Sequence, residues 1–153
     1  MGSNVGDRRA TLFGALDAMA AIDGVEVVAR SSLWQTTPVG GPPQDDFYNA
    51  AALLRTAMDP LDLLGALLAI ESRFGRRRAG RNLPRTLDLD LLWIDGVTVA
   101  LPGLKVPHPR LHDRAFALTP LLEIAPDATD PRTGVLYAAL LARLDKGGIR
   151  RLP

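Results

Sequence analysis

The sequence contains no cysteine among its 153 residues. Disulfide bonds and thiolate metal sites are therefore excluded, which fits a reducing compartment such as the cytoplasm. There are only eight aromatic residues, namely two Trp, two Tyr and four Phe, few for a sheet that stacks nucleic-acid bases. No apolar run approaches the roughly 18 residues of a membrane-spanning helix, and no secretory signal is visible. We expect a cytoplasmic protein that binds neither membranes nor nucleic acid.

Several common catalytic motifs are also missing. There is no G-x-x-x-x-G-K-[ST] loop, no G-x-G-x-x-G turn and no H-E-x-x-H helix, so P-loop, dinucleotide and zinc-protease chemistry are not indicated. His108 and His112 have the i, i+4 spacing of a helical zinc pair, but Pro107 and Pro109 prevent a regular helix there. We therefore expect no zinc site.

The charge of the chain is unevenly distributed. The net charge is only +1, yet residues 71–85 contain six arginines and a single acid, Glu71. A basic cluster of this size in a nearly neutral chain is typical of a site for a compact anion.

The order of the predicted elements indicates an α+β fold, with a mostly antiparallel sheet and helices packed on it. Length and composition favour a single domain over residues 1–153. The first predicted helix is 7–21, with Asn4 or Asp7 as its cap and a stripe of Leu12, Ala15, Leu16 and Met19. The others are a helix from an Asp59 cap and Pro60 to Gly75, one within 113–126 and one over 134–145. The predicted strands are 25–36, 47–56 and 86–94, the last turning at Asp95-Gly96 into a hairpin, with an extended segment at 106–112.

One acid stands on a predicted apolar stripe. The stripe of the second helix runs through Leu61, Leu64 and Leu68, and its next position is Glu71. A carboxylate on the buried side of a helix is costly unless it meets a donor. It either meets one in the interior or reaches water at the end of the stripe, and both interpretations remain open.

The segment "PRTLDLDLL", residues 84–92, places two carboxylates on one face of a predicted strand. With period two, Asp88 and Asp90 share a face and lie roughly 7 Å apart, opposite the leucines. Two such carboxylates can hold a pair of Mg²⁺ ions that clamp a polyphosphate, and the adjoining arginines can bind the same phosphates. A solvated sheet face beside a solvated basic loop is the alternative.

A loop rich in proline and glycine, residues 37–46, precedes Phe47 and Asn49. An aromatic ring for stacking and an amide with both donor and acceptor could form a pocket for a planar ring. A loop with ordinary core residues is the alternative.

Five segments in order give the chain a specific resemblance. They are "GSNVGDR" (2–8), "TTPVGGPPQDDFYNAA" (36–51), "IESRFGRRR" (70–78), "PRTLDLDLL" (84–92) and "VPHPRLHDRAFALTPLLEIAPD" (106–127). Together they resemble the 6-hydroxymethyl-7,8-dihydropterin pyrophosphokinase family of folate biosynthesis. The resemblance implies a ferredoxin-like α+β sandwich and an enzyme that transfers pyrophosphate from ATP to the pterin hydroxymethyl group, releasing AMP. It implies ATP as co-substrate and two Mg²⁺ ions as cofactors; we expect a monomer.

The resemblance also assigns roles to residues. The implied metal ligands are Asp88 and Asp90, and the implied catalytic residues are Arg76, Arg85, Asp88 and Asp90. The implied ATP-binding residues are Glu71, Arg77, Arg78, Arg81, Arg85, Leu91, Lys105, His108 and Arg114. The implied pterin-binding residues are Thr36, Thr37, Pro38, Val39, Phe47, Asn49, Asp88 and Phe116.

The family's first strand precedes "GSN", whereas only Met1 precedes it here. The sheet is therefore expected to lack its first strand, and we predict a natural start about eight residues upstream, by the length of a typical strand. Three alternatives to the active enzyme stay open: a ferredoxin-like nucleic-acid-binding module, a different D-x-D metal enzyme such as a nuclease or nucleotidyltransferase, and an N-terminally truncated inactive relative.

Overall fold

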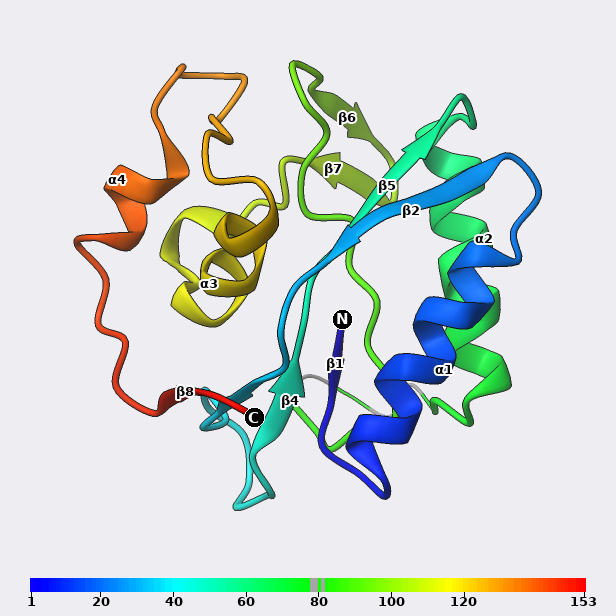
Figure 1. The fold of residues 1–153 in the computed structure, drawn as a ribbon, viewed down its shortest axis with the longest axis vertical. Helices are drawn as coiled ribbons and strands as arrows, with labels where there is room; N and C mark the ends of the chain where they lie inside the picture. Colours follow the sequence, from blue (N-terminus) through cyan, green and yellow to red (C-terminus); the bar gives the residue numbers. More distant parts are fainter. Residues whose placement is uncertain (78–79, 81) are drawn as a thin grey trace.

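The fold is taken from a computed structural model, which describes residues 1–77, 80 and 82–153. It is an α+β arrangement of antiparallel strands and helices (Figure 1). The elements are β1 (Gly2–Ser3), α1 (Arg8–Ala20), β2 (Val25–Arg30), β3 (Trp34–Thr36), β4 (Phe47–Asn49), β5 (Ala52–Thr56), α2 (Pro60–Arg73), β6 (Val99–Leu101), β7 (Leu104–Val106), the 3₁₀ helix η1 (Leu111–Asp113), α3 (Ala115–Ile124), α4 (Tyr137–Leu141) and β8 (Ile149–Arg151). Within the described ranges, none of the helices has the length and apolar character needed to cross a membrane.

Two of the predicted strands are each broken in the middle. Residues 25–36 form β2 and β3, and residues 47–56 form β4 and β5, so β2 pairs with β5 and β3 with β4. At the break, the Ser31 N–H donates to the Ala51 carbonyl (2.9 Å) and the Ala51 N–H donates to Ser31 Oγ (2.8 Å). The prediction of two continuous strands is wrong because, at this bend, Ser31 Oγ accepts the hydrogen bond that a backbone carbonyl would accept in a continuous ladder.

The principal sheet has four strands in the order β1–β4–β3–β8. The two-residue strand β1 begins at Gly2, after the position at which the sequence predicted a missing first strand, and it pairs with β4 through Gly2 and Asn49. On its other side Gly2 exchanges two backbone hydrogen bonds with Asp88, of 2.9 and 2.8 Å. The segment around Asp88 therefore lies next to β1 and is tied to the sheet.

The predicted strand 86–94 forms no continuous ladder: within the described chain it has isolated bridges at Asp88 and Ile94, so its predicted length is wrong. The prediction of its two faces is correct, since Leu87 and Leu89 are buried in the core and the aspartates lie on the other side. The turn at Asp95-Gly96 closes a single bridge between Ile94 and Val97. The longer hairpin, β6 with β7, turns at residues 102–103 instead.

Helices α1 and α2 lie together on one side of the molecule (Figure 1) and supply many of the residues of the main core. Asp7 caps α1 by accepting the Ala10 N–H (3.0 Å), and Asp59 caps α2 by accepting the Leu61 N–H (2.9 Å). The four predicted stripe residues of α1 are all buried.

The predicted stripe of α2 is partly wrong. The buried residues are Leu63, Leu67, Ile70 and Glu71, whereas Leu61 is exposed and Leu64 and Leu68 are half-buried. Because Leu64 and Leu68 line a cavity, they face a space and not the core.

The C-terminal third forms a second, smaller core. It packs α3 and α4 around Leu118 and Tyr137, both fully buried. The predicted closing helix 134–145 is reduced to α4, and the predicted extended segment 106–112 ends in η1. Strand β8, which the sequence did not predict, pairs with β3, and the Gly148 carbonyl accepts the Thr37 N–H (3.1 Å).

Candidate active site

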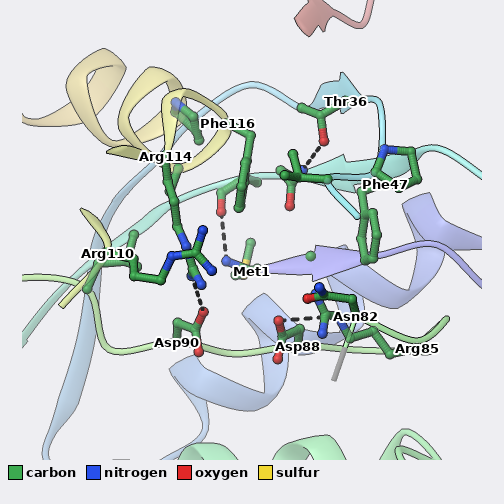
Figure 2. Close-up of a pocket in the computed structure, with 18 of the residues that line it drawn as sticks. Met1, Thr36, Phe47, Asn82, Arg85, Asp88, Asp90, Arg110, Arg114 and Phe116 are labelled. Carbon is green, nitrogen blue, oxygen red and sulfur yellow. Dashed lines mark hydrogen bonds and ion pairs between the residues drawn. The ribbon is translucent and has the colours of Figure 1, made fainter. Parts of the chain in front are cut away.

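A cavity of about 300 Å³ opens between β1, β4, the loop after β3 and α3 (Figure 2). It collects all eight residues for which the resemblance implied pterin binding. These are Thr36, Thr37, Pro38, Val39, Phe47, Asn49, Asp88 and Phe116.

The polar end of this cavity is fixed by a buried hydrogen bond. Asn49 Nδ2 donates to Thr36 Oγ1 at 2.6 Å, and both side chains are buried. A Cβ atom at Gly2 would lie 2.7 Å from Asn49 Oδ1, so any residue other than glycine would collide with the Asn49 amide. Because both partners are held, the cavity presents a preorganised polar edge.

Two aromatic rings project into the same cavity from different elements, Phe47 from β4 and Phe116 from α3 (Figure 2). The guanidinium group of Arg85 lies 5.0 Å from the centroid of Phe47, and that of Arg114 lies 5.8 Å from the centroid of Phe116. Rings of this kind offer a planar ligand stacking faces beside polar groups.

A second cavity, of about 460 Å³, lies between α2 and the β6–β7 hairpin. It holds four residues with an implied role in ATP binding, Glu71, Leu91, Lys105 and His108. Sequence reasoning missed its apolar lining, which is Leu64, Leu68, Leu101 and Leu104. The signal was available for Leu64 and Leu68, which the helical pattern singled out but assigned to the core.

The two cavities share a wall. Arg76, Asp88, Asp90 and His108 line both of them. A group bound at this wall is therefore accessible from both cavities.

Asp88 is the most strongly paired carboxylate of the wall. Arg76 Nη1 donates to its Oδ1, and Arg85 Nε lies 3.3 Å from its Oδ2. Burial works to raise the pKa of Asp88, but the charges of Arg85 and Arg76 outweigh it and hold that pKa below its ordinary value. Asp88 is thus ionised, with both oxygens facing cations.

The buried carboxylate of Glu71 meets donors on the aspartate segment. Its Oε1 accepts the Leu89 N–H at 2.7 Å and lies 3.3 Å from Arg76 Nη1, which also donates to the Leu87 carbonyl at 3.0 Å. Glu71 and Arg76 together fix the backbone on either side of Asp88. Of the two open interpretations of Glu71, the structure supports the interior donor.

Asp90 is the more accessible carboxylate, with 41% of its side chain exposed. Arg114 Nη1 lies 3.8 Å from Asp90 Oδ2 and 3.5 Å from His108 Nε2. Burial and the neighbouring Arg114 lower the pKa of His108, so the ring is neutral near pH 7. Because His108 Nδ1 accepts the Arg110 N–H (3.1 Å), the ring proton is assigned to Nε2, where it can donate.

Not every residue with an implied role is brought together. Arg77 is exposed and lines neither cavity, while Arg85 and Arg114 line the first cavity and not the second. Arg78 and Arg81 lie outside the described residues. Polar residues of the first cavity that the sequence did not single out as site residues are Gln44, Asn82 and Arg110.

The donor set of the wall suits a hard cation. Across residues 1–77, 80 and 82–153 there is no group of three or more metal-ligating side chains, so Asp88 and Asp90 stand as a pair. Mg²⁺ is typically held by one or two carboxylates together with water and substrate phosphates. The pair therefore fits a magnesium ion that arrives with a polyphosphate.

Comparisons with known proteins agree on one family. The family model described as 7,8-dihydro-6-hydroxymethylpterin-pyrophosphokinase (HPPK) matches residues 1–126. The chain is 44% identical over 152 residues to the 2-amino-4-hydroxy-6-hydroxymethyldihydropteridine pyrophosphokinase of Methylorubrum extorquens, covering 99% of this chain and 95% of that one. It is 44% identical over 153 residues to the enzyme of the same name from Pseudomonas aeruginosa (100% and 94%), and 42% identical over 145 residues to that from Synechocystis (95% and 74%). The chain belongs to the 7,8-dihydro-6-hydroxymethylpterin pyrophosphokinase family.

Proposed function

From this family membership we propose that the chain transfers pyrophosphate from ATP to the hydroxymethyl group of 6-hydroxymethyl-7,8-dihydropterin, releasing AMP in folate synthesis. The observation that carries this function is the wall of Arg76, Asp88, Asp90 and His108 between two cavities. A transferase for two substrates needs two binding sites that meet at the reacting atoms.

We assign the pterin to the first cavity. The buried amide of Asn49, oriented by Thr36, supplies a donor or an acceptor to the edge of the ring. Phe47 and Phe116 supply the stacking faces. Thr37, Pro38 and Val39 line the cavity from the loop after β3, and Val39 is 69% exposed, so this segment has room to close over a bound ring.

We assign the nucleotide to the second cavity, with the adenosine against its leucines and the phosphates toward the shared wall. Lys105 and His108 line the second cavity, and Arg76, Arg85 and Arg114 lie close to the two aspartates. These groups offer charge-assisted hydrogen bonds to phosphate oxygens. Roles for Arg77, Arg78 and Arg81 remain predictions from the resemblance.

Asp88 and Asp90 are the residues that would hold Mg²⁺, and we propose two ions. When bound, the metal neutralises phosphate charge and helps to align the phosphates for displacement. The protein's own part is to place the carboxylates, through the Gly2 hydrogen bonds of Asp88 and the contact of Glu71 with Leu89. For Asp88 to accept a metal, Arg76 and Arg85 have to turn away from its oxygens, which makes them available to the phosphates.

The reaction needs no protein nucleophile. The pterin hydroxyl oxygen forms a bond to the β-phosphorus, the bond from that phosphorus to the bridging α–β oxygen breaks, and its electron pair leaves with AMP. The proton of the hydroxyl group passes to solvent. Positioning in the two cavities and electrostatic stabilisation by the arginines are the contributions of this chain.

The finer fold is also a proposal. The Asp88 segment, β1, β4 and β3 follow one another with antiparallel pairing, and β5 and β2, which adjoin β4 and β3 in the chain, pair in a sheet of two strands. This order, with α1 and α2 packed beside it, supports a ferredoxin-like sandwich.

The remaining expectations are a single domain over 1–153, a monomer, a cytoplasmic location, and no binding to nucleic acid or membranes. The comparisons favour the enzyme over a nucleic-acid-binding module, because every relative named above is a pyrophosphokinase. The assay of AMP formation described below distinguishes the enzyme from a different D-x-D metal enzyme and from an inactive truncated relative, because neither of these forms AMP in a pterin-dependent reaction.

The decisive assay is AMP formation from ATP and Mg²⁺, with and without the pterin, by this chain and by Asp88→Ala. We expect AMP that depends on the pterin and is lost in the variant. AMP formation that is indifferent to the pterin would refute the assigned reaction.

A further inference from the structure

We propose that Arg110 binds the diphosphate group while it passes from the nucleotide to the pterin; this rests on the proposed function. Arg110 has no assigned role in the sequence analysis. It follows His108 and Pro109 and stands directly before η1, and it lines the first cavity. Its backbone N–H donates to His108 Nδ1, so its main chain is fixed next to the shared wall.

The side chain of Arg110 is less engaged than the other arginines of the site. Arg76 and Arg85 are paired with Asp88, and both are largely shielded from solvent. The ion pair described for Arg110 is with Asp113, 3.8 Å from its Nε, and 61% of the Arg110 side chain is exposed. Such an exposed pair contributes little to stability, so the guanidinium group can turn to a ligand at low cost.

Arg110 also lies close to another cation. Figure 2 shows the side chains of Arg110 and Arg114 directed to the same part of the cavity, above Asp90. Asp113 and Asp90 lie near these two guanidinium groups, but both ion pairs are long, at 3.8 Å, so the two cations can also donate to a bound anion.

Arg110 lines one of the two cavities, and this position determines which phosphate groups it can contact. Arg110 lines the pterin cavity but not the nucleotide cavity, whereas the shared wall borders both. In the transfer, the oxygen of the pterin gains the β-phosphorus, and the α-phosphate leaves with AMP. A residue on the pterin side of the wall therefore meets the β- and γ-phosphates, before and after transfer, and not the α-phosphate. Arg110 donates hydrogen bonds to their oxygens and is chemically unchanged.

The test compares four ligands on Arg110→Ala, Arg110→Lys and a matched control, Arg55→Ala. Arg55 is also an exposed arginine with one carboxylate partner, Glu26, and it lies on β5, away from both cavities. Calorimetric titration with Mg²⁺ present measures the Kd of ATP, AMP, the pterin and the pterin diphosphate.

For Arg110→Ala we expect about tenfold weaker binding of ATP and of the pterin diphosphate, which is about 1.4 kcal/mol. Binding of AMP and of the unphosphorylated pterin should stay within about twofold of the wild-type values, since neither carries the transferred group. Arg110→Lys should restore part of the loss, because it keeps the charge but not the forked donor geometry. Arg55→Ala should leave all four affinities unchanged.

Two outcomes would overturn the inference while leaving the proposed function intact. One is normal binding of ATP and pterin diphosphate by Arg110→Ala, with pterin-dependent AMP formation in the wild type. The other is equal weakening of AMP and ATP, which would place Arg110 at the nucleoside monophosphate. A wild-type chain that forms no pterin-dependent AMP would overturn both proposals together.

Discussion

Replacement of Glu71 tests how the aspartate segment is held in place. The Glu71 side chain is only 4% exposed, and its Oε1 accepts the Leu89 N–H at 2.7 Å. Leu89 is itself buried, so its N–H depends on this acceptor within the protein. Glu71→Ala leaves a buried N–H without its partner and removes the carboxylate next to Arg76. Breaking a buried charged contact in this way costs about 3–5 kcal/mol.

Glu71→Gln is the sharper perturbation. Its amide oxygen can still accept the Leu89 N–H, but the bond is no longer charge-assisted and the charge facing Arg76 is gone. Charge-assisted hydrogen bonds are worth about 1.5–3 kcal/mol and neutral ones about 1 kcal/mol. We therefore expect Glu71→Gln to lower the free energy of unfolding by about 1–2 kcal/mol, less than half the effect of alanine.

Urea denaturation without nucleotide measures these differences, with Glu26→Gln as the control. Glu26 pairs with Arg55 at 2.9 Å, but their side chains are 62% and 71% exposed, so its loss should cost about 0.5 kcal/mol or less. An unfolding free energy for Glu71→Ala within 1 kcal/mol of the wild-type value would refute Glu71 as the anchor. Equal losses for glutamine and alanine would mean that the charge matters and the Leu89 contact does not.

Three further changes have defined outcomes. Asp59→Ala removes the cap of α2 and should lower the free energy of unfolding by about 1 kcal/mol in urea denaturation. Gly148 has φ +75°, and a Cβ there would lie 2.6 Å from Thr37 Oγ1, whereas Gly134 has φ +72° and no atom within 4 Å of its Cβ position. Gly148→Ala should therefore lower the melting temperature more than Gly134→Ala does, and it should raise the KM of the pterin. An equal drop in melting temperature for the two variants would show that the contact with Thr37 has no effect. His108 has a lowered pKa in the folded chain, so the unfolded chain takes up its proton first and the free energy of unfolding should fall as the pH drops below about 6.5. His108→Gln should flatten this part of the pH profile, and an unchanged profile would contradict the assignment.

The sequence predicted those parts of the fold that depend on local signals. The Asp59 cap and the stripe of α1 follow from spacing and side-chain chemistry alone, and the structure agrees with them. For the cap of α1 the sequence left Asn4 and Asp7 open, and the structure has Asp7. The two faces of the aspartate segment were correct for the same reason, since period two places Leu87 and Leu89 on one side.

The failures arise where tertiary contacts override local pattern. The stripe of α2 was shifted because a leucine that lines a cavity has the same sequence signal as one in the core. Strand β8 was missed because residues 146–151, KGGIRR, carry no alternation, and the strand exists through its pairing with β3. Arg110 has no distinguishing signal in the sequence, and it is singled out only by its place on the cavity and its weak pairing.

The position of β8 has a consequence for the assembly of the chain during synthesis. The strand follows every other described element in the chain, yet it covers the free edge of β3, which carries Thr36 of the first cavity. Until Ile149–Arg151 are available, β3 presents unpaired backbone groups, and an uncovered strand edge is a template for association with other chains. A nascent chain, or one cleaved before Ile149, would therefore have both an incomplete first cavity and an unpaired edge at β3. Aggregation and loss of pterin binding should occur together in such a chain.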